Sequence, residues 1–525
     1  MSPMLADSRL DELLSAMDTD LATEGDSSPW SEEVSRVCRD RLAKGPLEAR
    51  LGLIRRLGQA RDPQPVALLI ERLPAVVDAR EAETILQALN DAKAKVPADQ
   101  IQRFLPCVPA VVAAGLSGDG RWVESLEALL DEPKVAYHAA LGLALLGSWQ
   151  SVPAIARRIA VNTGLLARGL IVALEVMKAS ESVPLLRDYL VQGDKEKAWD
   201  LAHALWRLTG REPLVPLPTR GGNFPGDVVS AWSSFDLSSP ARPRCENLVC
   251  DAVKETATFQ VVDGKGALRV DFDPPIPGSA WPRWDLSLYL GEDRIYAIGS
   301  TCGTCETTLR LLGFSADRAA LSASGIRAEV ADAVTMDRLI PALSPLLANL
   351  RTGHYVARLV DWDLERVTVP ERSWLTRRWL HRMGSNASVA EPNSVQWPGT
   401  EHFQVLRPGL ARVPTYGVVL PTAPFARLHP ATVDAFAEGI AKGRRPVAIL
   451  MGWVEQRDVE AGAYTERFLV NTVLDGHHKL AAYQKQGVPA RCLVIARVED
   501  CAGPDGDPAV WLHEALDDLR NPVAE

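Results

Sequence analysis

The chain has 525 residues, of which 47% are hydrophobic and 24% charged, and it carries a formal net charge of −10 with a pI near 5.6. This length is too great for a single hydrophobic core and predicts about three domains. The acidic balance disfavours nucleic acid as a partner, because sequence-independent binding to nucleic acid needs a basic surface.

No stretch approaches the ~18 consecutive apolar residues of a membrane span, so we expect no membrane partner. The amino-terminal residues lack the basic segment and apolar core of a secretory signal. The 8 cysteines are scattered and do not resemble a disulfide framework. These features together predict a cytoplasmic protein.

Residues 1–40 are polar and are expected to form a lead-in segment, and residues 41–216 are expected to form helical repeats. Apolar residues recur there at the spacing of amphipathic helices. The triplet Ser151-Val152-Pro153 returns as Ser182-Val183-Pro184, and 184 − 153 = 31 residues is about the length of a two-helix unit. Such pairs must stack to bury their apolar faces.

The phrase Ala-Leu-Gly-Leu-Ala-Leu-Leu-Gly-Ser-Trp-Gln-Ser-Val-Pro-Ala-Ile at 140–155 resembles the HEAT-repeat family of α-solenoids. The resemblance extends over residues 46–215. It implies an array that binds a protein partner rather than one that catalyses a reaction. A generic helical bundle is the alternative.

The pattern of apolar and polar residues changes after residue 216, and we expect residues 217–395 to form a mixed α/β region. Alternating apolar residues predict strands at 258–262, 267–272 and 294–299. Helices are expected at 305–313 and 336–351, and a further strand is expected to begin at Leu359.

This middle region contains Cys302 and Cys305, spaced Cys-x-x-Cys between a predicted strand and a predicted helix. Such a pair can be a redox couple, since a helix start lowers a thiol pKa, or half of a tetrahedral Zn²⁺ site. Cys245 and Cys250 would be the remaining zinc ligands. The alternative is that all four thiols are simply structural.

Residues 396–500 form the last predicted domain, and 501–525 a closing helix or tail. We expect a helix at 432–442, a strand at 446–454, a polar turn at 455–463, a strand at 467–474, a helix at 480–486 and a strand at 488–495. Between the second strand and second helix lies the sequence Asp475-Gly476-His477-His478-Lys479.

A strand that passes through a glycine turn into a helix start creates an anion site, because unpaired N–H groups and the helix dipole face the ligand. Asp475 is expected to cap the helix, and Gly476 permits a sharp turn. His477, His478 and Lys479 add donors at the same place. The turn therefore predicts a small anionic ligand, with phosphate the first candidate; the alternative is a cap followed by exposed polar residues.

The order of elements from about 428 to 496, with Leu-Asp-Gly-His-His-Lys-Leu-Ala-Ala-Tyr at 474–483, resembles the ParB/sulfiredoxin-like superfamily. The resemblance implies that Gly476, His477, His478 and Lys479 contact the phosphates of a nucleotide. His477 stands where sulfiredoxins carry their catalytic cysteine, and the arginines of ParB proteins are absent. The motif is closer to that of the free-serine kinases.

Three hypotheses follow from these patterns. The first is a nucleotide-binding protein, with ATP, ADP or another nucleotide and Mg²⁺, in which Asp475, His477 and His478 support phosphoryl transfer. Nearby carboxylates considered as the base are Glu455, Asp458 and Glu466. The second is a non-catalytic protein-interaction scaffold. The third is a DNA-associated ParB-like protein, which the acidic charge disfavours.

Overall fold

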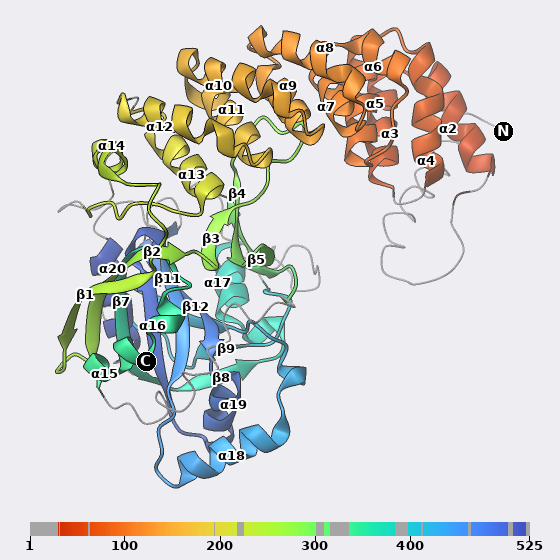
Figure 1. Cartoon of the computed structure of the whole chain (residues 1–525). Coiled ribbons are helices and arrows are strands. Elements are labelled where there is room, and N and C mark those ends of the chain that lie inside the picture. Colours follow the sequence, from red (N-terminus) through yellow and green to blue (C-terminus); the bar gives the residue numbers. More distant parts are fainter. Residues whose placement is uncertain are drawn as a thin grey trace. The chain divides into compact units, whose positions relative to one another are not determined.

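The computed structural model describes residues 30, 32–60, 63–193, 195–217, 225–300, 309–314, 335–383, 397–410, 413–459, 464–501 and 508–520. These residues divide into two compact units (Figure 1). The first unit runs to Tyr189 and includes Pro274–Pro282, and the second contains Leu190–Asp273 and the chain from Arg283 onward. A short segment of the middle region, 274–282, is thus part of the helical unit.

The helical expectation for the amino-terminal part is confirmed, since the described residues from 32 to 209 are built from helices joined by short turns. The helices are α2 (Glu32–Lys44), α3 (Leu47–Gln59), α4 (Pro63–Arg72), α5 (Ala79–Asp91), α6 (Ala98–Phe104), α7 (Val108–Leu116), α8 (Val123–Ala128), α9 (Ala136–Leu145), α10 (Val152–Val161), α11 (Gly164–Val176), α12 (Val183–Val191) and α13 (Ala198–Thr209).

The local structure recurs with the period seen in the sequence. A 3₁₀ turn precedes each of α8, α10 and α12, and these helices begin at Val123, Val152 and Val183, so the intervals are 152 − 123 = 29 and 183 − 152 = 31 residues. Within the first unit α3 packs on α5, α5 on α7, α7 on α9 and α9 on α11. Every second helix therefore joins one continuous row, as expected for stacked helix pairs.

Glycines allow the helices of this row to approach closely. A methyl group at Gly115 of α7 would lie 2.5 Å from the Cα of Gly142 in α9, and one at Gly169 of α11 would lie 2.4 Å from the ring of Tyr137. Both distances are far below ordinary carbon–carbon contact. Neither position can take a larger residue without separating two helices.

The second unit is built on a nine-stranded sheet and a four-stranded sheet. The strand orders are β1-β2-β7-β13-β11-β12-β10-β9-β8 and β3-β4-β5-β6. The strands are β1 (Arg244–Asp251), β2 (Thr256–Lys265), β3 (Leu268–Phe272), β4 (Asp285–Leu290), β5 (Asp293–Ser300), β6 (Arg310–Leu311), β7 (Arg351–Trp362), β8 (Leu364–Val367), β9 (His402–Val405), β10 (Thr415–Leu420), β11 (Ala448–Val459), β12 (Tyr464–Asp475) and β13 (Ala490–Arg497).

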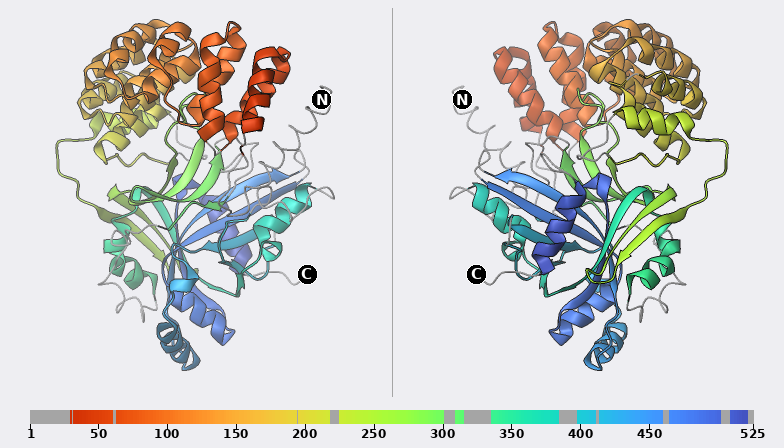
Figure 2. Two further views of the ribbon diagram at one scale, coloured as in Figure 1. Left: turned by 90° about the vertical axis from the view of Figure 1, so that its right-hand side faces the viewer. Right: turned by 90° about the vertical axis from the view of Figure 1, so that its left-hand side faces the viewer.

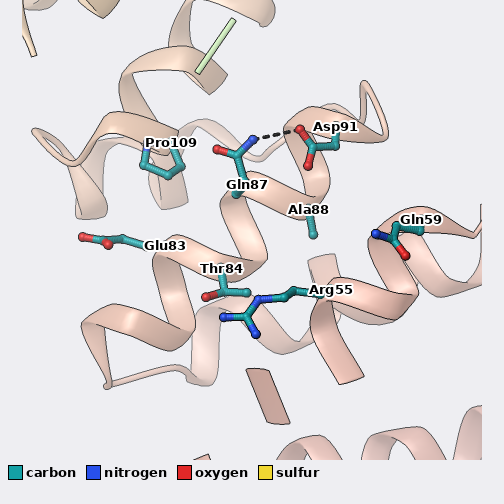
Figure 3. A pocket seen from close by; sticks show the side chains of 9 residues that line it. Arg55, Gln59, Glu83, Thr84, Gln87, Ala88, Asp91 and Pro109 are labelled. Atoms are coloured by element: carbon teal, nitrogen blue, oxygen red, sulfur yellow. Dashed lines mark hydrogen bonds between the residues drawn. The ribbon is translucent and has the colours of Figure 1, made fainter. Parts of the chain in front are cut away.

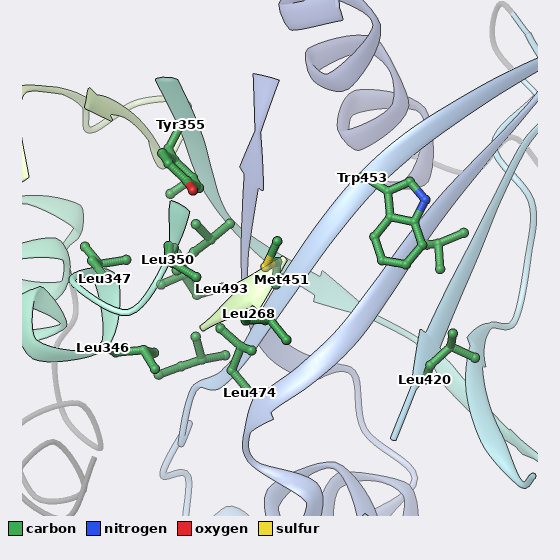
Figure 4. Packing of buried hydrophobic residues seen from close by; sticks show 14 of the residues in the cluster. Leu268, Leu346, Leu347, Leu350, Tyr355, Leu420, Met451, Trp453, Leu474 and Leu493 are labelled. Atoms are coloured by element: carbon green, nitrogen blue, oxygen red, sulfur yellow. The ribbon is translucent and has the colours of Figure 1, made fainter. Parts of the chain in front are cut away.

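Both faces of the large sheet are covered. On one face Met451, Trp453 and Leu474 belong to one apolar cluster with residues of the smaller sheet, of α15 (Met336–Ala342) and of α16 (Ser344–Leu347). Figure 4 shows Met451 and Leu474 close to Leu268 of the smaller sheet. On the other face lies α20 (Pro508–Arg520), which crosses the sheet (Figure 2). At the lower end of the sheet α19 (His477–Gln486) joins the same apolar cluster, and α18 (Pro430–Ala441) packs on α19. The other α-helices in the described part of this unit are α14 (Pro225–Ser234) and α17 (Trp374–Met383).

The last helix of the repeat pattern, α13, belongs to the second unit. His203 and Arg207 on α13 contact the buried carboxylate of Asp271 at 2.8 and 3.2 Å. Burial alone would raise the pKa of Asp271, but the hydrogen bond with His203 and the nearby arginines hold it below its usual value. His203 is thus partnered by a carboxylate from β3.

Three boundary expectations are wrong. The helix expected at 305–313 is replaced in its described part by β6, and β7 begins at 351 rather than 359. In the polar turn expected at 455–463, the described residues 455–459 are strand, because β11 continues to Val459 and pairs with β12 from Tyr464. Backbone pairing within this hairpin satisfies the polar groups of a segment whose side chains indicated a loop.

Candidate phosphate-binding site

The candidate turn lies where two parallel strands end. β10 and β12 pair in parallel, with Leu420 opposite Thr472. Their carboxyl ends therefore meet at one edge, which is where ligands bind in open α/β sheets. β12 ends at Asp475, Gly476 makes the turn, and α19 begins at His477 (Figure 1).

Gly476 fits this turn for two reasons. Its φ of 115° lies in the region that favours glycine. A Cβ there would also lie 2.8 Å from the Cβ of Ala448, the first residue of β11. Gly476 is the N-cap residue of α19 and has no side chain with which to cap it; Asp475, which was expected to cap the helix, lies one residue before the N-cap. Asp475 instead pairs with Lys479.

His477 is buried and binds the loop after β10. The backbone N–H of Thr422 donates to its Nε2 at 3.1 Å. The hydroxyl of Thr422 in turn donates to the carbonyl of Val473 at 2.6 Å. An Nε2 that accepts a hydrogen bond places the proton of a neutral imidazole on Nδ1.

His478 makes a similar contact with a different segment. Its Nε2 accepts the backbone N–H of His429 at 3.1 Å, and His429 is the N-cap residue of α18. The side chain thereby links the starts of α18 and α19, which pack against each other. Like His477, it accepts a hydrogen bond and is therefore neutral in this arrangement.

Lys479 is buried, and its ammonium group donates to the carbonyl of Val447 at 2.8 Å and to Asp475 at 2.6 Å. The side chain of Asp475 is 38% exposed, so its carboxylate reaches solvent while it neutralises the lysine. All three basic side chains thus contact backbone groups from three separate segments. The turn fixes the local fold whether or not it binds a ligand.

The three carboxylates considered as a base do not lie at this turn. Glu466 is nine residues before Asp475 on β12, a separation of roughly 30 Å along a strand, and it binds Arg378 at 2.9 Å. Glu455 and Asp458 pair with Phe468 and Thr465 near the same distant end. Of the carboxylates that the sequence analysis considered, Asp475 is the one that the described structure places at the turn.

A surface groove of about 400 Å³ adjoins the turn at His429. It is lined by His429, Ala431, Thr432, Ala435, Phe436 and Arg444. The residues that sequence reasoning missed are here and in the loop after β10. His429 precedes its partner His478 by 49 residues and Thr422 precedes its partner His477 by 55 residues, and no local pattern in the sequence linked them to the motif.

Of the four cysteines considered as zinc ligands, the two that the structure describes, Cys245 and Cys250, are not close together. Cys302 and Cys305 lie outside the described residues. Cys245 and Cys250 both lie on β1, where five residues of extended chain separate them by roughly 15 Å. That distance is too great for both thiolates to bind one tetrahedral zinc ion, whose Zn–S distances are about 2.3 Å. Burial raises the pKa of Cys245 to about 11 and also raises that of Cys250.

Within the described ranges no group of three or more histidine, cysteine or carboxylate residues is arranged to hold a metal ion. None of the described helices is long and apolar enough to cross a membrane. No family model matches the chain, and comparison with curated proteins gives no match.

Proposed function

We propose that the turn 475–479 binds the phosphate group of a small ligand, a nucleoside phosphate such as ATP or ADP with Mg²⁺ being the preferred class. The observation that carries the proposal is the position of the start of α19, which follows a glycine N-cap and lies at the carboxyl ends of two parallel strands. The first N–H groups of a helix have no partner inside the helix, and they attract anions.

Two further features support a nucleotide. The groove beside His429 offers the ring of Phe436 and the guanidinium of Arg444 next to the turn, as a base and a second phosphate would require. The carboxylate of Asp475 is of the kind that binds Mg²⁺ together with substrate phosphates. Phosphoryl transfer is the reaction class that such a site favours, within the ParB/sulfiredoxin-like fold that the motif resembles.

The test uses a variant that keeps the fold and reverses the charge preference. His478→Glu places a carboxylate in the first turn of α19, where the helix dipole stabilises it and where it can still accept the N–H of His429. It would repel a phosphate. Gln486→Glu makes the same charge change at the exposed far end of α19 and is the control.

Binding of ATP, ADP, CTP and pyrophosphate with Mg²⁺ is measured by calorimetry on the full chain. We expect affinity to fall at least tenfold in His478→Glu, and we expect no change in Gln486→Glu. Absence of binding by the wild-type chain to all four ligands, or equal binding by both variants, refutes the proposal. A ligand that does bind is then tested for transfer of its terminal phosphoryl group.

A second candidate function, a scaffold that binds a protein partner, is favoured by a groove of about 430 Å³ in the helical unit (Figure 3). The groove lies over α3, α5 and the start of α7, and a HEAT-like array would use such a surface. Its polar lining includes Arg55, Glu83 and Asp91. A photo-crosslinker at Thr84 is expected to give one discrete adduct that Asp91→Arg abolishes.

Zinc remains a separate proposal. An ion held by Cys302 and Cys305 could take at most one of the two thiolates of β1, because of their separation. Metal analysis of the purified chain decides it: less than about half an equivalent of zinc excludes a structural site.

A further inference from the structure

The edge strand β1 has features of an interface. It is the terminal strand of the nine-stranded sheet, and no described strand pairs with its outer edge. Leu248 and Val249 on this strand are 36% and 65% exposed, and Val253 in the following turn is 90% exposed. An edge strand with exposed apolar side chains presents unpaired backbone groups to another chain.

A bulge decides which side chains of β1 share a face. Arg244 to Glu246 pair with β2 in one register and Val249 to Asp251 in another, with one extra residue of β1 between them. Cys245 and Cys250 therefore lie opposite Val261 and Ala257. Residues directly opposite each other point to the same face of a sheet. Both cysteines therefore lie on the face of the nine-stranded sheet whose apolar cluster includes the smaller sheet, α15 and α16.

The other face carries the charged ends of the strand. Arg244 lies opposite Val262 and Asp251 opposite Thr256, and these two β2 residues share the face away from the cysteines. Without the bulge, residues seven apart would point to opposite faces. The bulge thus places a cation and an anion on one face and two thiols on the other, each pair arranged symmetrically about the centre of β1.

This arrangement is self-complementary. When two copies of β1 pair in antiparallel fashion about a two-fold axis normal to the sheet, a side chain on one face of β1 meets only side chains on the same face of the partner's β1. Two residues that lie opposite each other must therefore point to the same face. Pairing Arg244 with the partner's Asp251 places Cys245 opposite the partner's Cys250, because 244 + 251 = 245 + 250 = 495. Both pairs satisfy the face requirement in this single register.

We propose that the chain forms a two-fold dimer by antiparallel pairing of its β1 edges in this register. The interface consists of backbone hydrogen bonds, two symmetric Arg244–Asp251 pairs and contacts of Leu248 at the axis. Arg244 also contacts Glu246 and Asp263 in its own chain, so the partner's Asp251 adds to an existing acidic environment. A one-strand interface predicts weak association, with dimers at tens of micromolar.

The first experiment uses the native cysteines as reporters. A mild thiol oxidant is applied to wild type, Cys245→Ser, Cys250→Ser and an equal mixture of the two variants, and the linked peptides are identified by mass spectrometry. We expect a 245–250 link between chains in the wild type, none in either variant alone, and its return in the mixture. A mixture that gives no 245–250 link overturns the register.

The second experiment measures mass against concentration by sedimentation equilibrium. Leu248→Lys brings two like charges together at the axis, and we expect dimer affinity to fall about tenfold. Val161→Lys, a charge added at an exposed valine of the helical unit, is the control and should not change it. Bulges also occur as devices that keep edges apart. A wild-type chain that is still monomeric at about 500 micromolar, roughly ten times the range predicted from such a small interface, overturns the proposal in favour of that role.

Discussion

The two left-handed glycines of α19 offer a direct test of how the turn is built. Gly476 precedes the helix with φ 115°, and Gly487 follows it with φ 63°. An added methyl group meets nothing within 4 Å at Gly487 but lies 2.8 Å from Ala448 at Gly476. Both alanine variants carry the cost of a left-handed backbone, about 1 kcal/mol at Gly487. Gly476→Ala adds the clash.

The expected cost of Gly476→Ala is the sum of two effects. The unusual backbone costs about 1–3 kcal/mol, and forcing a methyl group into packed structure costs about 1–3 kcal/mol, so a total near 4 kcal/mol is reasonable. The difference from Gly487→Ala is then about 3 kcal/mol, or more than a hundredfold in the equilibrium for local opening. Hydrogen exchange of α19 amides, read by mass spectrometry, measures it. Equal protection in the two variants would refute the close approach of the turn to β11.

Two other predictions concern stability. Glu81→Gln should cost about 3 kcal/mol in urea unfolding, because it leaves Arg50 and Arg72 without their shared, 1% exposed carboxylate; Glu83→Gln, on the exposed face of the same helix, should cost less than about 0.5 kcal/mol. Burial lowers the pKa of His402 to about 4, below the ordinary 6.5, so the unfolded chain takes up the proton first and stability falls as pH drops from 6.5 towards 4. Between pH 7 and 5 this amounts to about 2 kcal/mol, and His402→Gln should remove that share of the slope; an unchanged slope contradicts the assignment.

The features predictable from the sequence are those with a local physical signal. The order of strand, glycine and helix around 475–479 was predicted correctly, because apolar runs on either side of a glycine indicate such a turn, although α19 begins at His477 and not at the expected Leu480. The roles of its side chains were not predictable. The bond from Thr422 to His477 spans 55 residues, and only the pairing of β10 with β12 brings the two together.

The extended hairpin and the cysteines illustrate the same limit. Polar residues at 455–459 indicate a loop, yet pairing with β12 makes them strand. The spacing of Cys245 and Cys250 is compatible with a metal pair only if the chain folds back between them. The strand that contains them is extended, and sequence spacing alone does not distinguish the two cases.

The placement of 274–282 has a consequence for how this chain can change over generations. The polypeptide leaves the helical unit after Tyr189, returns to it for these nine residues and leaves again. If recombination moved residues up to Tyr189 to another gene, they would lose the segment 274–282, which packs at Gln87. The second unit would keep this proline-rich segment without the helices on which it packs. The two halves are therefore expected to be inherited together, and a gain or loss of either one alone should be rare among related sequences.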